Sequence, residues 1–459
     1  MNQPRIAVIL AAGQGRRLKS KTPKVLHEVS GRPMIDWVMD SARAANCDRT
    51  IVVVGHGAAE VRAVIGGDDV TCVVQESQKG TGHALAQVES VLKGPASLLV
   101  LSGDVPLISE RTLNQLFGDS TRGWGAMAIA DVADPGSLGR VVAHQDGSLG
   151  KIVEVADASP SELALRCVNV GLYVLPAPEI FEYLRGLEPS NHQGELYLTD
   201  ALSAAAADGK SIYLSRLDDP REALGVNSRA DLAKVHFVMN RRKVQELMDQ
   251  GVTVIDPARV TVESQVRVER DCVLHPDVAL YGAVQIGEGC VIHQGAWIRD
   301  STLKDGVIVK PYSVLDGAEV GSDSHIGPFA RLRPGSRLEK DCRVGNYVEV
   351  KNSHLEQGVK ASHLTYLGDA TVGEETNIGA GVVTCNYDGV KKHRTKIGRR
   401  VFVGSDTMLI APVEIGDEAV IGAGSVITRD VPSGALAVER SREKHVPDWK
   451  ARRRKNIED

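Results

Sequence analysis

The sequence predicts an α/β domain followed by an all-β domain. Three observations support this: short β-branched runs alternate with helical segments in residues 1–229, one helical segment fills 230–250, and an aliphatic residue recurs every sixth position after 251. We therefore expect a Rossmann-like domain over 1–229, a linker helix over 230–250, and a left-handed parallel β-helix of hexapeptide repeats over 251–459.

The first domain is expected to contain a parallel sheet covered by helices on both faces. Four apolar runs predict buried strands, and two segments between them have helical spacing. The strands are Arg5–Leu10, Thr50–Val54, Val70–Val74 and Ser97–Leu101, and the helices are Met34–Ala45 and Thr81–Val91. From Trp124 to Val174, shorter strands with turn residues predict an antiparallel addition that covers a binding face.

The segment 230–250 predicts a helix of roughly 30 Å, at ~1.5 Å per residue. Ser228 is a plausible N-cap with Asp231 three residues on, and Gly251 is a natural stop. An ordinary surface helix would look the same, but the change of pattern after Gly251 favours a spacer between domains.

The hexad pattern predicts flat faces stacked three to a coil, with aliphatic side chains inside. Such thin layers agree with an aromatic content of only 4%. The 19-residue step from Ile378 to Ile397 predicts an extruded loop that holds Asn386–Gly389 and Lys391–Lys396. The frame positions are Val268, Leu274, Leu280, Ile286, Ile292, Ile298, Leu303, Val309, Leu315, Val320, Ile326, Leu332, Leu338, Val344, Val350, Leu355, Ala361, Leu367, Val372, Ile378, Ile397, Val403, Leu409, Ile415, Ile421 and Ile427.

Composition excludes several classes of function. The chain has 459 residues and a formal net charge of −5, which argues against a broad nucleic-acid-binding surface. Apolar runs such as Ile51–Val54 and Leu98–Leu101 are far shorter than the ~20 residues of a membrane span, and no signal peptide is visible. Seven scattered cysteines without a CxxC pair are typical of a reducing cytoplasm rather than a disulfide framework or zinc site.

The first candidate site follows strand Arg5–Leu10. Gly13 and Gly15 would let backbone amides approach a phosphate, and Arg17 and Lys24 would supply positive charge. A lone GxG turn is equally compatible with a plain strand-to-helix turn. Leu18 stands where a dinucleotide fingerprint needs its third glycine, and the Walker pattern is absent.

The larger constellation resembles the sugar-1-phosphate nucleotidyltransferase family. It comprises Leu10-Ala11-Ala12-Gly13, Pro23-Lys24, Gln75, Gly80-Thr81 and Ser102-Gly103-Asp104. The resemblance implies that the glycine-rich loop holds UTP, that Gln75, Gly80 and Thr81 contact the uracil, and that Asp104 and Asn227 bind Mg²⁺. It also assigns Gly139, Glu154 and Asn169 to the sugar. Arg16 departs from the family, whose close relatives have a small hydroxyl residue there.

The β-helix could be only an oligomerisation stalk, but its polar residues argue otherwise. Over almost the whole chain, these residues together with the first half resemble the bacterial bifunctional N-acetylglucosamine-1-phosphate uridyltransferase/glucosamine-1-phosphate acetyltransferase family. The resemblance implies His363 as the general base for the amine of glucosamine 1-phosphate, with Glu349 and Asn386 as its orienting residues. Arg333 and Lys351 would hold the phosphate, and Tyr366 and Asn377 the sugar. The acetyl-CoA groove would be lined by Ala380, Asn386, Tyr387, Ser405, Ala423 and Arg440.

The same resemblance implies a cytoplasmic homotrimer with two activities. It would acetylate glucosamine 1-phosphate and then convert N-acetylglucosamine 1-phosphate and UTP to UDP-N-acetylglucosamine, for peptidoglycan and lipopolysaccharide synthesis.

Two alternatives remain at this point. One is a monofunctional nucleotidyltransferase with a structural β-helix, which His363, Arg333 and Lys351 disfavour. The weaker one is a non-catalytic sensor of sugar nucleotides, which Lys24, Asp104 and Asn227 disfavour.

Overall fold

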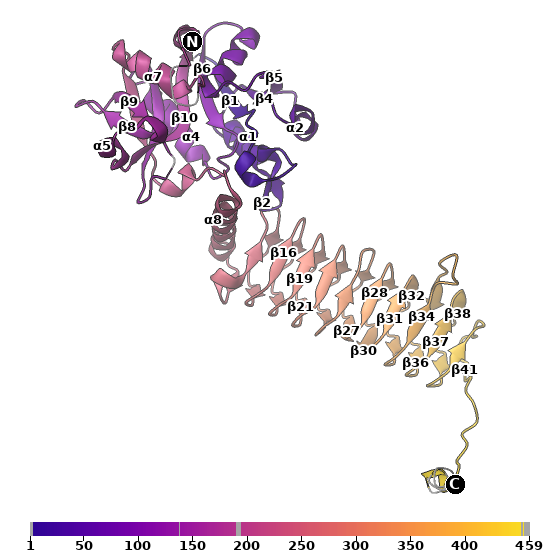
Figure 1. The fold of residues 1–459 in the computed structure, drawn as a ribbon. Helices are drawn as coiled ribbons and strands as arrows, with labels where there is room; N and C mark the ends of the chain where they lie inside the picture. The colour runs from indigo at the N-terminus through magenta and orange to yellow at the C-terminus, as the bar shows by residue number, and fades with distance from the viewer. Residues whose placement is uncertain (1–2, 137, 190–193, 451–452, 454–459) are drawn as a thin grey trace. The chain divides into compact units, whose positions relative to one another are not determined.

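Two units make up the chain, and they divide between Met239 and Asn240. The computed structural model describes residues 3–136, 138–189, 194–450 and 453 (Figure 1). An α/β unit comes first and a stack of short parallel strands second, as the sequence predicts. The proposed boundaries at 229 and 250 remain predictions.

A mixed sheet forms the centre of the first unit, in the order β11-β7-β10-β6-β1-β4-β5. Strands β6, β1, β4 and β5 are parallel, β10 is antiparallel to both β6 and β7, and the β8–β9 hairpin joins at β10. A separate small hairpin is formed by β2 (Glu28–Val29) and β3 (Arg32–Pro33). The bounds are β1 (Arg5–Ala11), β4 (Arg49–Val54), β5 (Val70–Val74), β6 (Ala96–Ser102), β7 (Gly125–Asp131), β8 (Arg140–Ala143), β9 (Leu149–Val153), β10 (Cys167–Ala177) and β11 (Ile212–Arg216).

The four predicted strands are therefore confirmed, and one expectation is corrected. Strands β7 and β10 are antiparallel as predicted, but they extend the main sheet instead of covering a binding face. The reason is that β7 is buried at successive positions from Gly125 to Ala130, so both of its faces need cover.

Each face of the sheet packs against its own set of helices. Ala7 and Ile9 of β1 pack with α1 (Met34–Ala44), α2 (Ala58–Val64) and α4 (Glu110–Ser120). Ile6 and Val8 point the other way, toward α3 (Thr81–Ala86), α6 (Glu179–Arg185) and α7 (Leu198–Ala207). The predicted helix Thr81–Val91 is α-helical only to Ala86 and continues as a 3₁₀ helix over Gln87–Val91. A further short helix is α5 (Pro160–Leu163).

Helix α8 (Arg229–Asp249) has the predicted caps. The hydroxyl of Ser228 accepts from the Asp231 amide at 3.2 Å, and the Asp231 carboxylate accepts from the Ser228 amide at 2.9 Å. Gly251 follows with φ +95°, a left-handed conformation that ends the helix. Val235 belongs to the core of the first unit, whereas Val244 and Leu247 belong to the core of the second.

Three columns of short parallel strands form the β-helix of the second unit. The first column is β12 (Thr253–Val254), β15 (Val273–Leu274), β18 (Val291–Ile292), β21 (Ile308–Val309), β24 (His325–Ile326), β27 (Arg343–Asn346), β30 (Lys360–His363), β33 (Asn377–Ile378), β36 (Phe402–Val403), β39 (Val420–Ile421) and β41 (Leu436–Ala437). The second is β13 (Thr261–Val262), β16 (Ala279–Tyr281), β19 (Trp297–Arg299), β22 (Val314–Asp316), β25 (Arg331–Leu332), β28 (Glu349–Lys351), β31 (Tyr366–Gly368), β34 (Val383–Cys385), β37 (Met408–Ile410) and β40 (Val426–Ile427). The third is β14 (Arg267–Val268), β17 (Gln285–Ile286), β20 (Thr302–Leu303), β23 (Glu319–Val320), β26 (Arg337–Leu338), β29 (His354–Leu355), β32 (Ala370–Val372), β35 (Thr395–Ile397) and β38 (Val413–Ile415).

The hexad frame is confirmed, because all its predicted positions are buried in one continuous core. The frame also continues where it was expected to break. Thr384 in β34 lies six residues after Ile378 and is fully buried. Its hydroxyl accepts from the Gly368 amide at 2.8 Å and donates to Gly368 O at 3.0 Å. The extruded loop is therefore shorter than predicted and spans residues 386–394 between β34 and β35.

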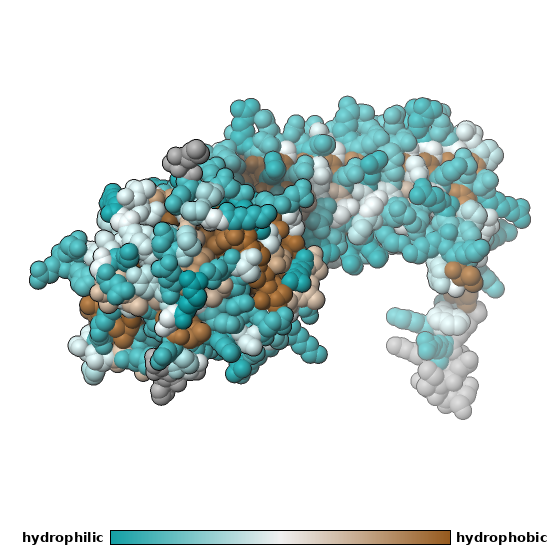
Figure 2. Space-filling view, turned by 90° about the horizontal axis from the view of Figure 1, so that it is seen from above, coloured by the Kyte–Doolittle hydropathy of each residue, from teal (hydrophilic) through white to brown (hydrophobic). Residues whose placement is uncertain are grey.

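On the face seen in Figure 2, hydrophobic side chains form small patches within a mostly hydrophilic surface. In the part of the chain that the structure describes, no helix has both the length and the apolar character needed to cross a membrane.

Candidate functional sites

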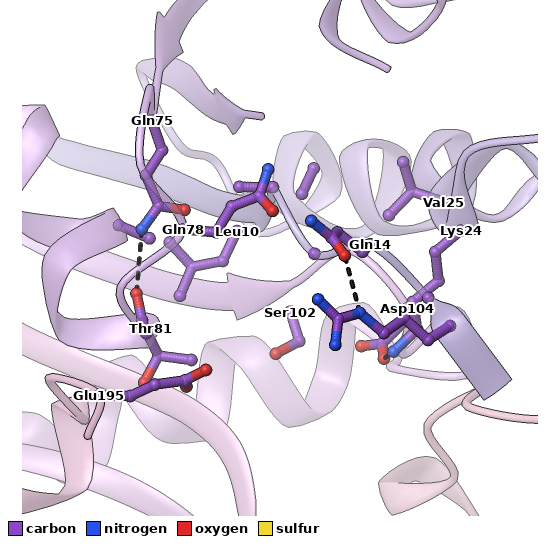
Figure 3. A pocket seen from close by; sticks show the side chains of 17 residues that line it. Leu10, Gln14, Lys24, Val25, Gln75, Gln78, Thr81, Ser102, Asp104 and Glu195 are labelled. Carbon is purple, nitrogen blue, oxygen red and sulfur yellow. Dashed lines mark hydrogen bonds and ion pairs between the residues drawn. The ribbon is translucent and has the colours of Figure 1, made fainter. Parts of the chain in front are cut away.

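A cavity of about 550 Å³ opens at the carboxyl ends of β1, β5 and β6, the edge at which open α/β sheets bind ligands. Figure 3 shows side chains from all three strand ends directed into it. Ten of the predicted residues line the cavity: Leu10, Ala11, Ala12, Gly13, Lys24, Gln75, Gly80, Thr81, Ser102 and Asp104. Gly103 does not line it, but its amide donates to Leu10 O at 3.0 Å and holds the ends of β6 and β1 together.

The loop after β1 folds tightly over Lys24. Gly15 has φ +60°, and a Cβ at this position would lie 2.8 Å from Lys24 Cβ. Only glycine allows both the backbone conformation and this close approach. Arg16 lines the cavity beyond this turn, whereas the predicted Arg17 is exposed and is not among the lining residues. The role of Arg17 stays a prediction.

A carboxylate oxygen of Asp104 and the amide oxygen of Asn227 both contact the ammonium group of Lys24. The Lys24 ammonium forms an ion pair with Asp104 and donates to Asn227 Oδ1 at 2.7 Å. The Val226 amide donates to Asp104 O at 2.9 Å and keeps the two segments adjacent. One carboxylate and one amide oxygen around a shared point fit a Mg²⁺ ion that takes its remaining ligands from phosphates and water. Elsewhere in the described chain, no set of three or more acidic, histidine or cysteine side chains could hold a metal.

The far end of the cavity is built around the Gln75 amide. Gln75 is buried, and its Nε2 donates to Gly80 O at 3.1 Å and lies 3.0 Å from His83 Nδ1. Burial, followed by the charge of Lys79, lowers the pKa of His83, which favours a neutral imidazole there. Figure 3 shows the Gln75 amide oxygen directed toward the cavity, where it can accept a hydrogen bond from a base. His83 was missed from the sequence, although it directly follows Gly80-Thr81-Gly82 as the third residue of α3.

Thr81 has a second role that its motif did not reveal. Its hydroxyl accepts from the Leu198 amide at 3.0 Å at the start of α7, which fixes the side chain while its O–H proton can still be donated to a ligand. Gly80, with φ +101°, packs so closely under Leu196 that a Cβ would lie 2.5 Å from Leu196 O. This contact requires glycine.

The three predicted sugar-site residues come together outside the lining of the cavity. The Asn169 amide donates to Gly139 O at 2.9 Å, and a Cβ on Gly139 would lie 3.3 Å from the Glu154 carboxylate. Burial is the main cause that raises the pKa of Glu154, and Thr199 donates to its Oε1 at 3.2 Å. Tyr173 bonds to the Asn169 side chain. Thr199 and Tyr173 carry no sequence motif and were missed.

In the second unit, His363 lies at the turn between the first and second columns. It is exposed, and its Nδ1 is 2.6 Å from Asn346 Oδ1, one coil earlier. The two predicted orienting residues are engaged elsewhere within the chain. Glu349 accepts from Arg333 at 2.8 Å, and Asn386 donates to Asp369 at 2.5 Å. The side chain that contacts His363 is that of Asn346, which occupies the same corner of the adjacent coil, and the orienting roles of Glu349 and Asn386 stay predictions.

Three cations gather at the far end of the second-column strands, where Arg333 and Lys351 each follow a buried frame position. Arg333 pairs with Glu349, Lys351 lies 3.6 Å from Asp369, and Lys392 reaches in from the extruded loop. The close approach and charge of Lys351 lower the pKa of Lys392. Three cations beside two carboxylates, Glu349 and Asp369, leave a net positive charge that can attract an anion. Tyr366 stands in register with Glu349, whereas Asn377 lies on the first column. Lys392 was not singled out from the sequence.

Four of the six predicted acetyl-CoA residues, Ala380, Ser405, Ala423 and Arg440, follow one edge of the β-helix, whereas Asn386 and Tyr387 lie in the extruded loop. Asn346, His363, Ala380, Ser405 and Ala423 each come two residues after a buried frame position of successive first-column strands. Arg440 continues the line and donates to Ala423 O at 3.3 Å. Tyr387 is exposed in the extruded loop, and its hydroxyl bonds to Gly389 O at 2.6 Å. An extended ligand could thus lie along the edge with one end at His363.

Comparisons with known proteins agree with this arrangement. Models of the MobA-like NTP transferase domain, the GMPPB C-terminal domain and the bacterial transferase hexapeptide (six repeats) match residues 7–167, 257–338 and 394–429. Three curated relatives carry the name Bifunctional protein GlmU. That of Syntrophotalea carbinolica is 47% identical over 97% of both chains. That of Ralstonia nicotianae is 44% identical over 96% of this chain and 97% of its own. That of Marinobacter nauticus is 42% identical over 97% of this chain and 98% of its own.

Proposed function

The chain belongs to the bifunctional GlmU family, and we propose that its two units catalyse consecutive steps in the synthesis of UDP-N-acetylglucosamine. It is a bifunctional transferase with a nucleotidyltransferase unit and a hexapeptide acetyltransferase unit, which use a nucleoside triphosphate and an acyl-CoA. The observation that carries the proposal for the second unit is an exposed His363 bonded to Asn346, together with a cluster of three cations at the end of the second-column strands, because a structural stalk needs neither.

In the first step, the substrate is glucosamine 1-phosphate. Arg333, Lys351 and Lys392 hold the phosphate, and His363 Nε2 takes a proton from the C2 ammonium while Asn346 fixes the ring through Nδ1. The freed amine attacks the thioester carbonyl of acetyl-CoA, a C–N bond forms, and the C–S bond breaks to release CoA. The edge from Ala380 to Arg440 supports the extended CoA chain.

In the second step, a phosphate oxygen of N-acetylglucosamine 1-phosphate attacks the α-phosphorus of UTP, and pyrophosphate leaves. Gln75 and the backbone near Gly80 read the uracil, and Glu154, Asn169 and Gly139 hold the sugar. Lys24 neutralises charge on the reacting phosphates. A Mg²⁺ ion held by Asp104 and Asn227 would supply further charge stabilisation.

We further propose a homotrimer in the cytoplasm. Four residues of successive coils, Tyr312, Phe329, Tyr347 and Leu364, form an exposed apolar ladder directly beside His363; their exposed fractions are 51%, 46%, 58% and 62%. A second copy that covers this ladder would also enclose an active site that is open in the single chain. All seven cysteines are free thiols, which agrees with a reducing compartment.

One coupled assay tests the function. Purified protein is given glucosamine 1-phosphate, acetyl-CoA, UTP and magnesium, and both CoA and pyrophosphate are followed. We expect CoA release to precede pyrophosphate release, with UDP-N-acetylglucosamine as the final product. Pyrophosphate release only when N-acetylglucosamine 1-phosphate is supplied, without any CoA, would contradict the acetyltransferase assignment.

A further inference from the structure

The cavity of the first unit lacks positive charge for a triphosphate. Among the described residues, its charged lining consists of Arg16, Lys24, Asp104 and Glu195, so the two cations are offset by two carboxylates. Lys24 is already paired with Asp104 and bonded to Asn227. A nucleoside triphosphate brings several negative charges into this space, and they need a cation that is not already neutralised.

Arg16 is the lining cation in the described chain that has no carboxylate partner. Its Nε donates to Gln14 Oε1 at 2.8 Å, a hydrogen bond drawn at Gln14 in Figure 3, and its two terminal nitrogens form no hydrogen bond or ion pair with the described residues. The guanidinium is therefore held at one edge while the other edge, with its parallel N–H groups, remains available.

The backbone fixes the place of this side chain. Gly15, in a left-handed conformation, packs on the stem of Lys24, and Arg16 begins the 3₁₀ turn Arg16–Leu18, whose Leu18 is buried. Arg16 thus stands over the Lys24–Asp104 end of the cavity, opposite the Gln75 end. It is exposed and lines the cavity, which puts it at the mouth.

We propose that Arg16 binds the β- and γ-phosphates of the nucleoside triphosphate, with Gln14 as the positioning residue that orients its guanidinium. This inference rests on the proposed uridylyl transfer and adds a phosphate ligand to it. A planar guanidinium can bridge oxygens of two phosphates, which an ammonium does less well.

Calorimetric titration of the full chain with UTP and with UMP, in magnesium-containing buffer, tests the inference. Arg16→Ala should weaken UTP binding about tenfold to a hundredfold, since hydrogen bonds between charged groups have about this effect. UMP affinity should stay within about twofold, because UMP lacks the two outer phosphates. Lys21→Ala is the matched control: it removes an exposed cation from the same segment that does not line the cavity. It should leave both affinities unchanged.

Two further variants sharpen the result. Arg16→Lys should recover only part of the lost UTP affinity, and Gln14→Ala should lower it severalfold, again without an effect on UMP. Equal losses for UTP and UMP in Arg16→Ala, or equal losses in Arg16→Ala and Lys21→Ala, would overturn the role of Arg16. Wild-type protein that binds neither nucleotide would instead overturn uridylyl transfer, and this inference with it.

Discussion

The two units place their candidate sites in opposite ways. The first encloses its ligands at the carboxyl ends of strands, in a cavity lined by segments that lie far apart in the sequence, from Leu10 to Glu195. The second keeps a continuous apolar interior and carries its polar residues outside, on corners of neighbouring coils. A layered α/β unit can therefore complete a site by itself, whereas a coil has no interior for one and needs a second surface.

The largest effect is expected for a variant of His363, in the site on the surface of the β-helix. His363→Ala should lower acetyl transfer by about 10²–10⁴-fold, the usual contribution of a general base, with uridylyl transfer unchanged. CoA release at saturating substrates measures the loss. Full acetyl transfer in this variant would show that another group or water removes the proton.

The comparison between two asparagines refines this test. Asn346→Ala should reduce acetyl transfer more in kcat than in KM, because it frees the ring of His363. Asn386→Ala should act mainly on KM, because Asn386 anchors the loop that carries Lys392 through Asp369. If the two variants have the reverse effects, Asn386 is the orienting residue after all.

A second prediction concerns the interior of the coil. Thr384→Val should lower the free energy of unfolding of the β-helix by about 1–3 kcal/mol, because the buried Gly368 amide loses its acceptor. Chemical denaturation measures the change. Thr395→Val is the matched control, since that hydroxyl is fully buried and has no hydrogen-bond partner among the described residues. Its removal should be neutral or stabilising, and equal destabilisation by both variants would refute the argument.

The smallest effect is expected for Glu154 in the first unit, as a change in melting temperature. Burial raises the pKa of Glu154, so its charged form destabilises the folded state once the pH exceeds the ordinary value of 4.5. Glu154→Gln should thus raise the melting temperature slightly at pH 7, and the difference should vanish below pH 4.5. Binding of N-acetylglucosamine 1-phosphate should fall in the same variant.

Glu162 provides the control of opposite sign. Lys151 and Ser159 lower its pKa to about 2, so its stabilising contribution is present above pH 4.5 and is lost as the pH falls toward 2. Glu162→Gln should therefore lower the melting temperature at pH 7. A lower melting temperature at pH 7 in both variants would mean that burial of the charged Glu154 carboxylate does not destabilise the folded state.

The contrast also explains what the sequence could predict. The β-helix followed from the hexad frame because its period is local, and even Thr384 kept that period with a hydroxyl in place of a methyl group. The contact between Asn346 and His363 was missed although both lie two residues after a frame position; this offset on adjacent coils could have revealed it. Motifs located the ends of β1 and β6, but His83, Tyr173 and Thr199 contribute through tertiary packing that no spacing encodes.

The central claim is that one chain carries two independent sites, and a crossed assay tests it most directly. CoA release and pyrophosphate release are measured for wild type, Asp104→Asn and His363→Ala, with the folded state checked by circular dichroism. Asp104 pairs with Lys24 in the first unit, so Asp104→Asn should abolish pyrophosphate release and leave CoA release near wild type, while His363→Ala should do the reverse. Loss of both activities in either folded variant would contradict the account.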